Sequence, residues 1–239
     1  MSQFQHHANL NATLRYAKAK KIASLLELDK CDQKKILEIG CGSGVISEYF
    51  ASKDGFNNNV DAVDVVDVRI EKNNYKFQQI DSVMLPFEDG IFDIVITNHV
   101  IEHVGGRQLQ ELHLSEIQRV LKFDGVVYLA VPNRWMLIEP HYKLIFLSWW
   151  PVSWRSRYLQ IFTDHKHYDC KPLEMHELES KLKSANLGFE NISVKALRCV
   201  FELEGKNSLL QRSIALLPDR IIAWMNHINP TLVYRILRT

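Results

Sequence analysis

A short segment near the N-terminus combines a carboxylate with three closely spaced glycines, Glu38-Ile39-Gly40-Cys41-Gly42-Ser43-Gly44. Apolar residues precede the segment, and residues 45–53 have the apolar spacing of a helix. A buried parallel strand that turns through glycine into a helix has this pattern. Glycine lets the backbone turn sharply and lie close to a ligand. The segment therefore predicts a cofactor-binding loop with a carboxylate at its start.

A second carboxylate is expected beside this loop. Residues 60–64 have the composition of a strand, and Asp64 is at its expected carboxyl end. Asp64 follows Gly44 at the separation at which a carboxylate meets the ribose in a βαβ nucleotide site. Asp61 and Asp67 are alternatives in the same acid-rich stretch. We prefer Asp64 because it directly follows the apolar pair that ends the predicted strand.

The spacing of the glycines discriminates between cofactors. A dinucleotide fingerprint has its third glycine one position later, where this chain has Val45, so a nicotinamide-dependent oxidoreductase is disfavoured. The segment closely resembles the first motif of class I S-adenosylmethionine-dependent methyltransferases, and the resemblance extends over residues 36–131. It implies that the Glu38 carboxylate receives the ammonium group of S-adenosylmethionine. It also implies backbone contacts to this cofactor from Gly40, Cys41, Gly42 and Gly44.

A second block strengthens the resemblance. Asp81-Ser82 is followed by Leu85-Pro86-Phe87-Glu88-Asp89-Gly90-Ile91-Phe92-Asp93, which is similar to a broad subfamily, methyltransferase type 11, that includes quinone-pathway and other small-molecule methyltransferases. The resemblance implies that Asp81 accepts a hydrogen bond from the adenine amino group. It places the backbone N–H of Ser82 on an adenine ring nitrogen. The alternative is that Asp81 only caps a turn.

Polar residues follow the predicted fourth strand, residues 92–97. Ligands of open α/β sheets bind at the carboxyl ends of the strands, so Thr97, Asn98 and His99 are expected to face the methyl-donating sulfur. The Glu102-His103 pair also resembles the subfamily, and we expect His103 to be a hydrogen-bonded structural residue. Transfer to a hydroxyl needs a general base, and histidine is well suited near neutral pH. The candidates are His141 and His99, of which we prefer His141.

The order of the elements predicts an α/β fold. Strands and helices alternate from residue 36 to residue 131, which requires a parallel sheet covered on both faces. We expect a Rossmann-like, seven-stranded, mostly parallel sheet in which residues 189–197 are the sixth strand and residues 231–237 are a last, antiparallel strand. Residues 1–30 should form an N-terminal cap helix. The family resemblance makes Arg15 and Tyr16 candidates for contact with the methionine end of the cofactor, although a solvated helix face is the preferred interpretation. Residues 31–239 should form the methyltransferase domain.

A helical insertion is expected after the fifth strand, at about residues 132–170. Four of the five tryptophans of the chain lie in it. An aromatic segment of this length over the active-site edge favours a substrate lid, although packing of its aromatic residues onto the main core is an alternative. The stretch that begins Pro132-Asn133-Arg134-Trp135 resembles methyltransferases of bacterial surface-sugar and lipid-linked glycan synthesis. This resemblance implies a hydroxyl of a sugar or glycolipid as the acceptor.

Other functions stay open at this point. Quinone-precursor or other small-molecule O- or C-methylation is the main alternative, and a catalytically silent domain that binds S-adenosylmethionine as an interaction module is another. The formal net charge of +1 gives no argument for nucleic-acid binding. The four scattered cysteines indicate neither a metal site nor disulfides. We expect a cytoplasmic protein, with the aromatic insertion and the basic C-terminal segment as a membrane-peripheral alternative.

Overall fold

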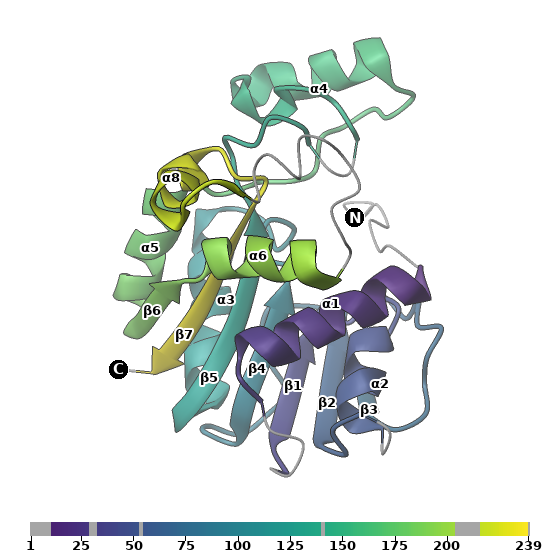
Figure 1. Cartoon of the computed structure of the whole chain (residues 1–239). Helices are drawn as coiled ribbons and strands as arrows, with labels where there is room; N and C mark the ends of the chain where they lie inside the picture. Colours follow the sequence, from purple (N-terminus) through teal and green to yellow (C-terminus); the bar gives the residue numbers. More distant parts are fainter. Residues whose placement is uncertain (1–10, 29–32, 53–54, 140–141, 204–215, 239) are drawn as a thin grey trace.

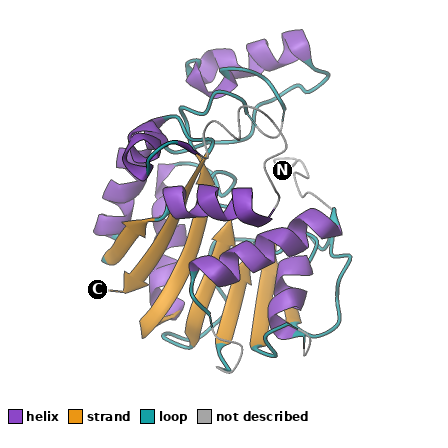
Figure 2. Cartoon of the chain, in the orientation of Figure 1, coloured by secondary structure: helices purple, strands orange, loops and turns teal. Residues whose placement is uncertain are grey.

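A seven-stranded sheet forms the centre of the molecule (Figures 1 and 2). The structure is a computed structural model, and it describes residues 11–28, 33–52, 55–139, 142–203 and 216–238. The strand order is β3-β2-β1-β4-β5-β7-β6; the first five are parallel, and β7 is antiparallel to both of its neighbours. The strands are β1 Lys35–Ile39, β2 Asn59–Asp64, β3 Lys76–Gln79, β4 Phe92–Asn98, β5 Leu121–Pro132, β6 Leu187–Asn191 and β7 Thr231–Arg238.

Helices cover both faces of the sheet (Figure 1). On one face lie α1 (Ala12–Leu25), α2 (Val45–Ala51) and α6 (Ser193–Leu203); on the other lie α3 (Arg107–Val120) and α5 (Met175–Ser184). Successive strand residues enter opposite cores because side chains alternate along a strand. In β1, Ile36 packs under α1 and α2, whereas Leu37 packs under α3 and α5. The predicted Rossmann-like architecture with an antiparallel last strand is confirmed.

The predicted alternation of strands and helices fails at two connections. Residues 65–75 between β2 and β3, and residues 80–91 between β3 and β4, form turns and extended loops without a helix. Both loops lie at the carboxyl ends of the strands. Because neither connection forms a helix, the backbone of these two loops is available to line a site.

The sixth strand is shorter than predicted. It ends at Asn191, and Ser193 begins α6, which the sequence reasoning assigned in part to the strand. The side-chain oxygen of Asn191 accepts a hydrogen bond from the Ser193 N–H (3.0 Å), and this local turn competes with strand pairing. The buried residues Ala196 and Cys199 then recur at helical spacing. β-branched residues near this turn made it resemble a strand in sequence.

Two further features complete the fold. Residues 123–125 lie inside β5, where the register with β4 shifts as in a β-bulge. The helices α8 (Asp219–Trp224) and the short η2 (Met225–His227) precede β7.

The insertion after β5 stands beyond the carboxyl ends of the parallel strands (Figure 1). It contains the short helix η1 (Leu147–Trp149) and α4 (Val152–Phe162). Its buried residues Tyr142, Leu147 and Leu159 form a small core separate from the two cores that flank the sheet. The insertion is thus a raised element with packing of its own.

Tyr234 joins three elements at the antiparallel edge. Its side chain is fully buried; its hydroxyl donates to Glu179 Oε1 (2.9 Å) and accepts from Asn191 Nδ2 (3.2 Å). Tyr234→Phe should lower the free energy of unfolding in urea by about 1–2 kcal/mol, because both partners lose this hydroxyl. Tyr158→Phe is the control, since that hydroxyl bonds the Ile145 carbonyl in an exposed setting. An equal fall in the free energy of unfolding for Tyr234→Phe and Tyr158→Phe would contradict the stabilising role of the buried Tyr234 hydroxyl.

Candidate functional site

The glycine loop between β1 and α2 is packed against protein on both sides. Gly40 and Gly44 have φ values of +72° and +77°, which side chains rarely adopt. A Cβ on Gly40 would lie 2.5 Å from Cγ2 of Val100, and one on Gly44 would overlap the Tyr75 hydroxyl and the Glu71 carbonyl. The sequence predicted that glycine is needed for approach to a ligand. At these two positions the structure requires glycine for contacts within the protein.

Asp64 fastens the end of β2 to this loop. Its Oδ2 accepts a hydrogen bond from the Gly42 N–H (2.8 Å), and its Oδ1 accepts one from the Val65 N–H (2.7 Å). Each carboxylate oxygen can accept a further hydrogen bond, so hydroxyl groups of a ligand can bind here. The rival Asp67 is held in a two-point ion pair with Arg69 (2.9 and 2.8 Å), which keeps the pKa of Asp67 well below its usual value. Of the two, Asp64 is the carboxylate bonded to the loop.

Glu38 lies buried at the end of β1, with 2% of its surface exposed. Burial raises its pKa to about 7, although the Ser47 hydroxyl donates to the carboxylate and the positive charge of Arg15 favours ionisation. A cationic ligand group placed beside Glu38 would therefore find a carboxyl that ionises near neutral pH. Tyr16, the second α1 residue predicted near the cofactor, packs edge-to-face on Tyr49 at 5.0 Å.

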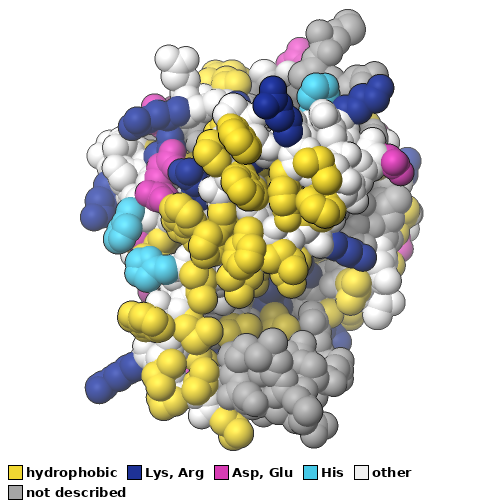
Figure 3. All heavy atoms as spheres, turned by 90° about the horizontal axis from the view of Figure 1, so that it is seen from above, with side chains coloured by type: hydrophobic (Ala, Val, Ile, Leu, Met, Phe, Trp, Pro, Cys, Tyr) yellow, Lys and Arg dark blue, Asp and Glu magenta, His cyan; other side chains and the backbone are white. Residues whose placement is uncertain are grey.

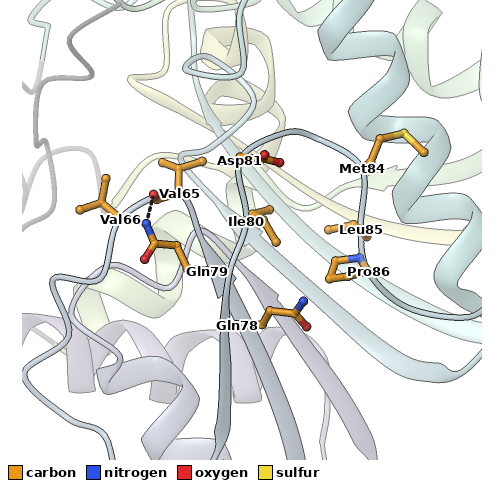
Figure 4. A pocket seen from close by; sticks show the side chains of 9 residues that line it. All are labelled: Val65, Val66, Gln78, Gln79, Ile80, Asp81, Met84, Leu85 and Pro86. Carbon is orange, nitrogen blue, oxygen red and sulfur yellow. Dashed lines mark hydrogen bonds between the residues drawn. The ribbon is translucent and has the colours of Figure 1, made fainter. Parts of the chain in front are cut away.

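An open pocket of about 770 Å³ lies where β2 and β3 end (Figure 4). Val65 and Ile80 line it on the side of the strands, and Met84 and Leu85 line it from the loop opposite. The exposed Asp81 is at its rim, and Ser82 follows in the same loop. Apolar walls with one carboxylate acceptor suit a flat ring that carries an amino group.

An arginine network holds the loop that forms one pocket wall. The Arg119 guanidinium on α3 pairs with both oxygens of Glu116 (2.8 Å each) and donates to the carbonyls of Leu85 (2.9 Å) and Phe87 (2.7 Å). Glu116 in turn accepts from the Leu85 N–H (2.8 Å). Sequence reasoning missed both residues. Their separation of three positions on a helix was the available signal, but their partners lie about thirty residues away.

The last two residues of β4 have different surroundings. Thr97 is fully buried, and its hydroxyl lies 3.5 Å from Nε2 of His113 on α3. Burial lowers the pKa of His113 to about 4, so this ring is neutral. The Thr97 side chain therefore lies in the core against α3, and its contact with the cofactor stays a prediction. Asn98, at the end of the strand, has 8% of its surface exposed.

His99 has a conformation that suits a functional role. Its φ of +59° is unusual for a residue with a side chain, and its N–H donates to the Ala130 carbonyl of β5 (2.8 Å). Its Nδ1 lies 3.4 Å from Oε1 of Glu102, which is fully buried. Burial alone would raise the pKa of Glu102, but the adjacent His99 and His103 rings hold it below its usual value. The pairing favours the tautomer in which Nε2 of His99 is the basic nitrogen.

Two other predicted residues need separate mention. His141 lies outside the described residues; the adjacent Tyr142 donates its N–H to the buried Glu139 carboxylate (2.7 Å). Cys41 is 1% exposed, and burial beside Glu38 and Asp64 raises the pKa of its thiol. The Cys41 side chain is therefore part of the protein interior, and only its backbone can meet a ligand.

Comparisons with known proteins agree with this geometry. A family model for a methyltransferase domain matches residues 37–129. The ubiquinone biosynthesis O-methyltransferase of Rickettsia akari is 30% identical over 153 residues, which span 60% of this chain and 56% of that protein. The protein of the same name from Bartonella tribocorum is 31% identical over 109 residues, or 43% of each chain. This chain thus spans about half the length of the curated relatives it matches.

Solved structures show the same fold. Geranyl diphosphate methyltransferase in complex with S-adenosylmethionine matches with a TM-score of 0.54 at 16% identity, over 94% of this chain and 84% of that one. The 4+2 cyclase SpnF matches with a TM-score of 0.55 at 15% identity, over 93% and 81% of the two chains. At such identities the likeness concerns the fold, and the reaction must be argued from the site.

Arg119→Lys tests the network that holds the pocket wall. Lysine cannot reproduce a planar fork that bonds one carboxylate and two carbonyls together. The free energy of unfolding should fall by about 1–2 kcal/mol, and amide hydrogen exchange at Leu85 should accelerate. Arg107→Lys is the matched control, because Arg107 forms an exposed pair with Glu111 on the same helix. Unchanged exchange at Leu85 in Arg119→Lys would show that the loop is held by other contacts.

Proposed function

We propose that this chain is a class I S-adenosylmethionine-dependent methyltransferase and that it methylates a hydroxyl group of a sugar, glycolipid or other small molecule. One arrangement carries the proposal. The glycine loop, the Asp64 carboxylate, the pocket beside Asp81 and the His99–Glu102 pair all lie at the carboxyl edge of β1 to β4. In this proposal the binding site for the methyl donor and the general base lie along the same edge of the sheet.

The donor would be held mainly by charge and backbone contacts. In this proposal the buried Glu38 receives the ammonium group, Asp64 accepts from the ribose hydroxyls, and Asp81 accepts from the adenine amino group. Bound S-adenosylmethionine supplies an activated methyl group, so the protein has chiefly to align donor and acceptor. Further donor contacts are proposed from the backbone of Gly40, Cys41, Gly42, Gly44 and Ser82 and from Asn98.

We assign the general base to His99. Nε2 of its favoured tautomer can take the proton of an acceptor hydroxyl, and the buried Glu102 carboxylate can stabilise the resulting imidazolium. The side chain of His99 is 21% exposed, so it is open to solvent at this edge of the sheet. His141, preferred from the sequence, stays a prediction. Residues of the described part of the chain thus support His99 most directly.

The proposal for the acceptor rests on the insertion after β5. The segment stands beyond the carboxyl edge of the sheet, where a lid would cover an acceptor (Figure 1). Its resemblance to enzymes of lipid-linked glycan synthesis favours a sugar hydroxyl. The relatives named for ubiquinone biosynthesis favour a second candidate, the phenolic hydroxyl of a quinone precursor. Both candidates offer a hydroxyl to the same base, and both are molecules that carry long apolar tails.

An apolar surface is present for such a tail or for the membrane that holds it. Seen from above, the insertion side carries a broad group of hydrophobic side chains (Figure 3). Val152, Trp154, Ile161 and Phe162 of α4 expose between 57% and 73% of their surface. Exposed apolar patches of this kind mark interaction sites, and tryptophan favours the membrane interface. The described residues include no helix that could span a bilayer. We propose peripheral contact with lipid through α4.

A methyl-transfer screen tests the function. The chain with labelled S-adenosylmethionine should label a lipid-linked sugar or a polyprenyl catechol, and His99→Ala should lower kcat by about 100- to 10,000-fold with donor affinity unchanged. His167→Ala, an exposed histidine of the insertion, is the control and should keep wild-type turnover. Donor binding with no transfer to either acceptor class would favour a silent binding module. Wild-type turnover in His99→Ala would remove His99 as the base.

The raised pKa of Glu38 predicts a pH-dependent donor affinity. Below pH 7 the carboxyl is protonated, and a ligand ammonium must displace that proton in order to pair with it. Affinity for S-adenosylmethionine should therefore rise between pH 5.5 and 7.5, by up to about tenfold per unit below pH 7. Calorimetry on Glu38→Gln, which cannot ionise, should give weaker binding without this slope. The same slope in the variant would place the ammonium elsewhere.

Lipid contact predicts selective loss of vesicle binding. Trp154→Ser combined with Ile161→Ser should reduce cosedimentation with anionic phospholipid vesicles at least tenfold, because two exposed apolar anchors are removed. Phe123→Ser is the matched control, since this side chain is 80% exposed at the start of β5, near the opposite edge of the sheet. Equal vesicle binding by the wild type, the double variant and Phe123→Ser would refute lipid contact through α4.

A further inference from the structure

A mixed group of ligand atoms lies where the insertion returns to the sheet. His103 follows β4, whereas Asp169 and Cys170 end the insertion. Cys170 Sγ lies 3.9 Å from His103 Nδ1 and 3.7 Å from Asp169 Oδ1, and one ligand atom from each residue lies within 4.8 Å of the others. We propose that His103, Asp169 and Cys170 bind a zinc ion that fastens the insertion to the loop after β4.

The distances fit tetrahedral zinc. Zinc binds sulfur at about 2.3 Å and nitrogen or oxygen at about 2.0–2.2 Å, which places two ligand atoms about 3.5–3.6 Å apart around a tetrahedral centre. The distances from Cys170 Sγ to His103 Nδ1 and to Asp169 Oδ1 exceed this value by only a few tenths of an ångström. Side-chain rotation alone can close such a gap. A thiol, an imidazole and a carboxylate together favour zinc over the hard cations magnesium and calcium, which prefer oxygen ligands.

Outer groups already orient two of the three ligands. The second ring nitrogen of His103, Nε2, lies 3.8 Å from Oε1 of Glu102. The fully buried Glu102 carboxylate lies between the two imidazoles, with its Oε1 also 3.4 Å from Nδ1 of His99. The Tyr142 hydroxyl donates to Asp169 Oδ1 (3.0 Å). A carboxylate behind a ligating histidine is the usual outer shell of a zinc site.

The local charge also favours a cation. The carboxylates of Glu139, Asp169 and Glu102 all lie near the Cys170 thiol. A divalent cation would offset this concentration of negative charge. On binding, the Cys170 S–H bond breaks, its proton passes to solvent, and the sulfur electron pair forms the bond to zinc. Three protein ligands leave the fourth position for water or another ligand.

Cobalt is the probe for this site, because a thiolate–cobalt bond gives a near-ultraviolet charge-transfer band. Protein freed of metal with a chelator should bind one equivalent of CoCl₂ with this band, and one equivalent of ZnCl₂ should remove it. Cys170→Ser should abolish the band, whereas Cys199→Ser, which changes another buried cysteine, should keep it. Asp169→Asn should weaken cobalt binding by about tenfold or more, with the band retained.

Glu102→Gln separates a zinc site from an ordinary hydrogen-bonded cluster. It should lower cobalt affinity by about 10- to 100-fold, because the orienting carboxylate is lost. Circular dichroism establishes that each variant is folded before titration. A band that persists in folded Cys170→Ser, or no band in the wild type at excess cobalt, would overturn the proposal. These outcomes do not depend on methyl transfer, so they leave the proposed function to its own tests.

Discussion

The close contact of three loops at the carboxyl edge of the sheet is the constraint on which the site depends. The glycine loop touches Val100 after β4 on one side and Tyr75 before β3 on the other, at positions where a Cβ would overlap protein atoms. The Gly42 N–H bonds Asp64 at the end of β2. The carboxyl ends of β1, β2 and β4 are thereby brought into one edge. A side chain added to the loop would separate them before it met any ligand.

Two buried carboxylates give this edge its electrostatic character. Burial outweighs the Ser47 hydrogen bond and the Arg15 charge at Glu38, and its pKa rises to about 7; Glu102 faces two imidazoles, and its pKa falls. The difference arises from the neighbours, since both groups are fully desolvated. The first is suited to receive a cation from outside, and the second is suited to hold a histidine in one orientation. The same residue type therefore supports two different roles a short distance along the sheet edge.

The insertion adds a layer above this edge. It has a small core of its own and exposes apolar residues of α4. It contacts the main domain near its two ends, where Cys170 lies close to His103 and the Trp135 indole donates to Glu174. The core of the insertion is therefore separate from the two cores that flank the sheet. This separate packing suits the lid proposed above.

The sequence by itself determined the fold class and, through its resemblance to class I methyltransferases, the cofactor family. It also predicted Glu38, Asp64 and Asp81 as site residues near strand ends, because these lie in short motifs next to recognisable strand patterns. It did not determine the direction of Thr97, the start of α6 at Ser193, or the pairing of Arg119 with the pocket wall. Each of these depends on a partner that is distant in sequence or on a local hydrogen bond that competes with strand pairing. The meeting of His103 with Cys170 across 67 positions was likewise decided by tertiary structure, since only the return of the insertion to the sheet brings them together.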